Sequence, residues 1–217
     1  MKNGACGKGM VIGMERNGRI PEVMDRMQPV MEAYFREACI FFQQTVDYSG
    51  EKIWENVKSA VGEALQKAVS LQKEGRKGKL QYLCFSFMEY GSLLDRPEIR
   101  IDALDEGFYL DEQEAAAEFV PDFWQERYRE DIHRLDKEIG KAFIRVQNYE
   151  RMEMRKVYMG YYYLALFGML QSMAERIMET VQESGVGITG RFMMLGGKYM
   201  DEGVLLCERR EEAAYEQ

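Results

Sequence analysis

Glu130 and His133 are three positions apart in a strongly helical segment, so their side chains share one helix face. Di-iron carboxylate bundles use this E-x-x-H spacing for two of their ligands. The chain contains a single histidine, however, and the second imidazole of such a centre is missing. An exposed histidine on the flank of the apolar stripe is the simpler interpretation, and we expect no metal and no cofactor.

Gly185, Gly187 and Gly190 match the G-x-G-x-x-G pattern of dinucleotide-binding loops. That pattern needs a strand before it and a helix after it, whereas here a predicted helix comes first and a predicted strand follows. We therefore expect these glycines to end a helix. No serine or cysteine nucleophile signature accompanies the histidine, so we assign no catalytic residue. The sequence leans toward a protein that is not an enzyme.

An acidic region between Asp95 and Glu118 offers a different chemistry. Paired carboxylates can act as acid and base, but their spacing here fits no calcium loop, and a solvated surface is the simpler interpretation. Flanked by aromatic rings, such a surface can capture a protein partner of basic character. The predicted function is therefore a soluble, non-enzymatic protein-binding or regulatory module, for example of the toxin-neutralising or adaptor type. The residues predicted to bind the partner are Asp102, Asp105, Glu106, Phe108, Tyr109, Asp111 and Trp124.

Tyrosines are concentrated in the stretch from Val157 to Ala174, which contains no charged residue. Its length touches the lower limit for crossing a bilayer, but its polar residues favour a central core helix. Buried tyrosine hydroxyl groups need hydrogen-bond partners, either in the core or at a cavity. The alternative function is therefore a small-molecule binding protein or enzyme, with a pocket lined by Tyr158, Tyr161, Tyr162 and Tyr163.

A compact basic cluster falls in the glycine-containing loop near Gly75 and Gly78, and its members are Lys73, Arg76, Lys77 and Lys79. Such a cluster can hold a phosphate or a carboxylate. A solvated turn after a helix is the simpler account.

Helical periodicity predicts the elements that position these residues. Apolar residues at steps of three and four predict helices over 21–47 and 51–74, joined at Ser49 and Gly50 into an antiparallel hairpin. Pro29 predicts a kink. Further helices are expected around Ala115–Ala117, over 122–148 and over 149–184.

Short apolar runs predict the strands. We expect a small antiparallel sheet formed by segments near 80–110 and 190–207. The run 80–88 is compatible with a strand or a buried helix. The predicted fold is thus α+β and predominantly helical, with five or six helices around a central apolar helix at about 149–184.

Composition limits the partners. The chain has 217 residues, 46% of them hydrophobic, and a formal net charge of −8. This charge disfavours nucleic acid and anionic membranes. The methionine content, 16 residues, suits adaptable packing. An exposed part of the apolar helix at about 149–184 could serve as a homodimer face.

The expected organisation is a flexible glycine-rich leader (1–15), a single globular domain (16–208) and a charged tail (209–217). The leader has no apolar run long enough for a signal peptide. The four cysteines, Cys6, Cys39, Cys84 and Cys207, show no zinc or disulfide spacing. Reduced, mostly buried thiols and a cytoplasmic location are the expectation.

Overall fold

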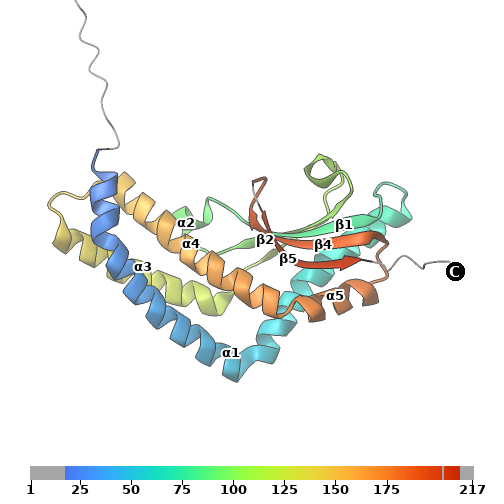
Figure 1. Cartoon of the computed structure of the whole chain (residues 1–217), viewed down its shortest axis with the longest axis horizontal. Coiled ribbons are helices and arrows are strands. Elements are labelled where there is room, and N and C mark those ends of the chain that lie inside the picture. The colour runs from blue at the N-terminus through green and yellow to red at the C-terminus, as the bar shows by residue number, and fades with distance from the viewer. Residues whose placement is uncertain (1–17, 202, 211–217) are drawn as a thin grey trace, which may run out of the picture.

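The computed structural model describes residues 18–201 and 203–210. Figure 1 shows one sheet with helices below it and to its left, so the predicted α+β class is confirmed. The leader expected at 1–15 lies outside the described residues. The elements are α1 (Ile20–Lys73), β1 (Leu80–Phe87), α2 (Gly91–Leu94), β2 (Ile99–Asp105), the 3-10 helix η1 (Phe108–Leu110), β3 (Ala116–Phe119), α3 (Asp122–Ala142), α4 (Asn148–Ser172), α5 (Ala174–Glu183), β4 (Ile188–Lys198) and β5 (Gly203–Arg210).

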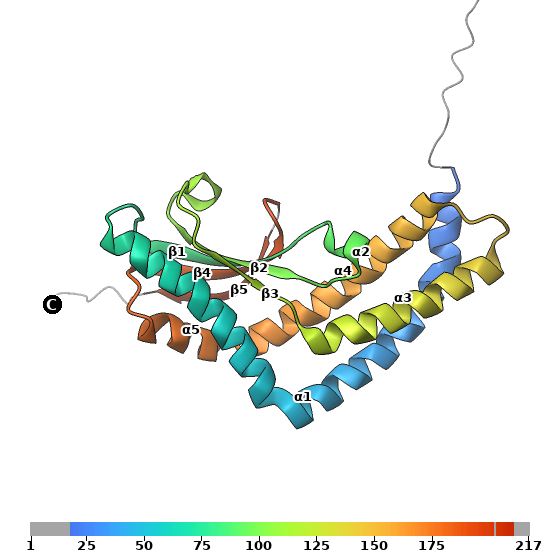
Figure 2. The same ribbon diagram turned by 180° about the vertical axis from the view of Figure 1, so that it is seen from behind.

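Helix α1 bends at Ser49, where φ is −131° and ψ is 18°. The predicted antiparallel hairpin is wrong, because one residue outside the helical region bends the chain without reversing it. The two halves form a V in both views (Figures 1 and 2). Pro29 lies inside the helix, and the helix leaves helical backbone angles at Ser49 instead.

The sheet has the strand order β3-β2-β1-β4-β5. The expected antiparallel sheet is corrected to a mixed one, because β1 pairs with β4 in parallel. The reason is the long connection between these two strands: it carries four α-helices and the 3-10 helix η1, and it returns the chain to the same end of the sheet, which a parallel pair requires. The run at 80–88, left open from sequence, is a strand.

The short helix predicted around Ala115–Ala117 is wrong as well. Ala116–Phe119 is strand β3, which pairs with β2. Alanine favours a helix in isolation, but here the small side chains let the C-terminal half of α1 pack closely on this edge of the sheet. Lys67 of α1 also donates a hydrogen bond to the Ala116 carbonyl at 2.6 Å.

The helix expected over 149–184 is divided at Met173, where the backbone leaves the helical region. Helix α4 precedes this residue and the amphipathic α5 follows it. No helix in the described ranges is long and apolar enough to span a membrane.

The N-terminal half of α1, together with α3 and α4, forms a helical bundle beside the sheet (Figure 2). Its centre is aromatic. Trp124 of α3 stacks on Phe42 of α1 with ring centroids 4.3 Å apart, and both rings pack nearly perpendicular to that of Tyr162 from α4.

Candidate functional site

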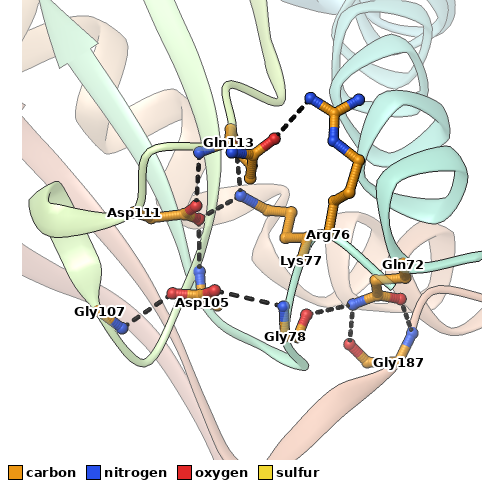
Figure 3. Close-up of polar contacts among 9 residues, drawn as sticks. All are labelled: Gln72, Arg76, Lys77, Gly78, Asp105, Gly107, Asp111, Gln113 and Gly187. Atoms are coloured by element: carbon orange, nitrogen blue, oxygen red, sulfur yellow. Dashed lines mark hydrogen bonds and ion pairs between the residues drawn. The ribbon is translucent and has the colours of Figure 1, made fainter. Parts of the chain in front are cut away.

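The acidic loop between β2 and β3 is largely held by internal hydrogen bonds (Figure 3). The Asp105 carboxylate accepts the backbone N–H of Gly107 at 2.9 Å and that of Gly78 at 3.3 Å. The Asp111 carboxylate accepts the N–H groups of Gln113 and Asp105. These two predicted partner-binding side chains therefore shape the loop itself.

Lys77 from the basic cluster supplies the cation for this loop. Its buried ammonium group is paired with the buried Asp111 carboxylate and also donates to the Gln113 carbonyl at 2.8 Å. The sequence favoured a solvated turn for the basic cluster, but Lys77 is buried and the carboxylate that it holds belongs to the chain itself. Beside it, Gln72 bonds to both the N–H and the carbonyl of Gly187, so this glycine of the G-x-G-x-x-G pattern already has internal partners. Gly185 ends α5 with φ +73°.

Two more predicted partner-binding residues are buried. Trp124 is 2% exposed in the bundle core. Asp102 is held by the Nε of Arg100 at 2.9 Å, and burial raises the pKa of its carboxyl group even though Arg100 opposes the shift. Glu106 is exposed, while the half-buried rings of Phe108 and Tyr109 pack on Tyr82 and Tyr199 respectively.

The tyrosines of α4 divide into two groups, and the first surrounds Asp131. Tyr158 and Tyr162 donate to Asp131 Oδ2 at 2.7 and 2.9 Å. Arg127 and Arg134, on the same helix as Asp131, lie 3.0 and 3.3 Å from Oδ1, and the Arg127 Nε also donates to Oδ2 at 3.2 Å. Asp131 is fully buried, so these contacts engage its carboxylate and both tyrosine hydroxyl groups inside the core. Burial raises the pKa of both tyrosines.

Tyr161 and Tyr163 lie outside that cluster. Tyr161 packs on Phe35 of α1 at 5.3 Å. Tyr163 stacks on Phe87, the last residue of β1, at 4.5 Å, and lines a cavity. Of the four predicted pocket tyrosines, Tyr163 therefore lines this cavity.

That cavity, which we call the groove, opens at the carboxyl ends of the parallel strands β1 and β4. Their last residues, Phe87 and Lys198, are register partners. The main part encloses about 660 Å³, and a second lobe of about 290 Å³ extends along α4 past Val157, Gly160 and Tyr163. The main part is lined by Phe87, Met88, Glu89, Tyr90, Ser92, Leu93, Met152, Glu153, Lys156, Lys198 and Tyr199.

The rim of the groove is apolar and exposed. Leu93 of α2 is 56% exposed and Met152 of α4 is 47% exposed, with Tyr90 beside them at 39%. Large apolar side chains that remain exposed around one cavity are typical of binding surfaces.

Two lysines meet one glutamate within the groove. Lys198 Nζ lies 2.7 Å from Glu89 Oε1, and Lys156 Nζ lies 3.9 Å from the same oxygen. The hydrogen bond from Lys198 and the two positive charges lower the pKa of Glu89.

The described residues offer no metal centre. Glu130 and His133 are both exposed on α3, and no group of three or more histidine, cysteine or acidic side chains that could hold a metal gathers within 18–201 and 203–210.

Cys39, Cys84 and Cys207 are free thiols. Cys84 is buried as expected, whereas Cys39 is exposed and Cys207 half-buried. Burial, reinforced by Asp102, raises the pKa of Cys84 to about 12, so it is a poor nucleophile.

Sequence reasoning missed Lys156, Lys198, Leu93 and Met152. One signal was available: Leu93 and Leu94 follow Gly91 in a short polar segment that fits neither a helical stripe nor a strand. Lys156 and Lys198 gave no such signal in the sequence, because only the fold brings residues 89, 156 and 198 together.

Comparison of the chain with protein-family models, with curated proteins and with solved structures finds no match.

Proposed function

We propose that the protein is a non-enzymatic binding module that holds a segment of a protein partner in the groove. The observation that carries this proposal is the exposed apolar rim formed by Tyr90, Leu93 and Met152 around a cavity at the strand ends. Met88 and Met152 suit this use, since methionine adapts to varied partners. An adaptor or toxin-neutralising role in the cytoplasm, as expected from sequence, is one form that such binding could take.

The groove replaces the acidic loop as the main binding surface in this proposal. Asp105 and Asp111 are engaged by internal donors, so reversing their charges would disrupt the loop as well as any partner contact. Glu106 remains exposed, and Tyr109 packs on Tyr199, which lines the groove. The acidic loop therefore flanks the groove.

Peptides selected from a random displayed library against the protein test this function. We expect Leu93→Asp and Met152→Asp to weaken binding of the selected peptides about tenfold or more, since a rim charge disrupts the apolar contact. Leu164→Asp is the matched control, because Leu164 is 69% exposed on α4 and lies outside the groove lining. Fluorescence anisotropy measures the affinities. Equal binding by all three variants would place the partner site elsewhere.

A small-molecule binding protein or enzyme is the second candidate. The second lobe favours it, because Val157, Gly160 and Tyr163 border a narrower space than the main part. Native mass spectrometry of protein purified from its own cells separates the candidates. A stoichiometric small molecule would favour the second candidate, whereas a co-purifying protein whose binding Leu93→Asp abolishes would favour the first.

A further inference from the structure

The groove contains a defined position for one carboxylate. Lys198 stands at the end of β4 and Lys156 on α4, and their ammonium groups approach the same oxygen, Glu89 Oε1, at 2.7 and 3.9 Å. Two cations that come from different elements and meet at one point form a clamp for an anionic group. In the free protein, Glu89 occupies that clamp.

Glu89 can leave the clamp at small cost. Its side chain is 57% exposed, and that of Lys156 is 60% exposed, so these ion pairs are solvated and individually weak. Lys198 also has Asp201 at 3.4 Å, and Glu153 lines the same groove. An incoming carboxylate would therefore compete with acidic groups of the chain, Glu89 above all.

The space next to the clamp is apolar. Phe87 stacks on Tyr163, and Val157 and Gly160 border the second lobe. A Cβ atom added at Gly160 would meet no atom within 4 Å, so close packing does not explain this glycine. Its lack of a side chain keeps the lobe open, although glycine within a helix costs about 1 kcal/mol relative to alanine.

We propose that the groove binds an acidic–apolar peptide segment, in which an Asp or Glu side chain displaces Glu89 from Lys156 and Lys198 while neighbouring apolar side chains enter the second lobe. This inference rests on the proposed function and specifies its partner. Charge complementarity at the clamp favours an acidic segment over a basic one.

Decanoate, decylamine and decanol serve as probes, since they share an apolar chain and differ in the head group. We expect decanoate to shift the ε-methyl resonances of Met88 and Met152 and to bind about tenfold more tightly than decylamine or decanol. Lys156→Met combined with Lys198→Met should remove this preference. Lys52→Met is the control, because Lys52 is exposed on α1.

Glu89→Gln distinguishes a carboxylate that competes with the ligand from one that only forms a structural ion pair. Removing the competing carboxylate should tighten decanoate binding roughly twofold to fivefold, which matches the strength of a surface ion pair. Unchanged or weaker binding would show that Glu89 does not compete for the clamp and would overturn the inference.

The selected peptides separate this inference from the proposed function. Peptides that depend on Leu93 and Met152 and are rich in Asp or Glu would support both. The acidic partner would be overturned if the groove-dependent peptides contained no acidic residues, or if decanoate affinity did not change when both lysines were replaced. Either result would leave the proposed binding module in place. If decanoate binding depends on the two lysines but no selected peptide depends on the groove, the peptide occupant and the proposed function are both overturned. Only the carboxylate-binding position at Lys156 and Lys198 would then remain supported.

Discussion

Asp131→Ala is expected to lower the free energy of unfolding by about 3–5 kcal/mol, because it removes the acceptor at the centre of a buried charged cluster. The hydroxyl groups of Tyr158 and Tyr162 donate to this carboxylate inside the core. Without it they stay buried with no acceptor, and each unsatisfied group costs about 1–3 kcal/mol. For a chain of this size, such a loss lowers the melting temperature by roughly 10 °C.

Glu37→Gln is the matched control for Asp131→Ala. Glu37 also pairs with Arg127 and Arg134, but its side chain is half-exposed, so its loss should cost about 1 kcal/mol or less. Urea denaturation measures both variants. The hydrogen bonds of Asp131 link α3 to Tyr158 and Tyr162 of α4, so a cost below about 1 kcal/mol for Asp131→Ala would contradict a stabilising role of this cluster.

Lys77→Met is expected to have an effect of similar size. It leaves the Asp111 carboxylate buried without a cation, which costs about 3–5 kcal/mol in comparable pairs. The N–H groups of Gln113 and Asp105 still bond to Asp111, so we expect the lower end of that range. Since this carboxylate also fixes the loop that carries η1, amide exchange at Gly107 should accelerate.

Arg76→Met is the control for Lys77→Met. Arg76 is the preceding residue and bonds to the side chains of Glu74 and Gln113, but it is 58% exposed. Its loss should change stability by about 1 kcal/mol or less. If Arg76→Met and Lys77→Met destabilise the protein equally, the buried pair is not what holds the acidic loop.

Sequence patterns predict the helical part of the fold best, because burial on one face leaves a periodic trace. Trp124, Tyr128, Leu135 and Ile139 follow the stripe predicted for 122–148 and are all buried in α3. The errors arise where tertiary pairing outweighs local preference. The alanines of β3 form a strand because β2 and α1 enclose them, and the parallel pairing of β1 with β4 leaves no trace in either strand.

The site was less predictable than the fold. The need of the buried tyrosine hydroxyl groups for partners was visible in the sequence, but their acceptor, Asp131, looked like one more charge on a helix face. The acidic loop looked solvated because Lys77, its buried cation, precedes Asp111 by 34 residues. The groove draws on three separate segments, so no local pattern could reveal it.

The affinity of the selected peptides for Gly160→Leu tests the central claim, the groove as binding site, most directly. A leucine here adds bulk next to open space and raises helix propensity by up to about 1 kcal/mol. Gly168→Leu, at an exposed position of α4, is the control with a similar gain. We predict that Gly160→Leu keeps or raises stability and weakens binding about tenfold or more, while Gly168→Leu binds as the unchanged protein does. Undiminished affinity in a folded Gly160→Leu protein would contradict the account.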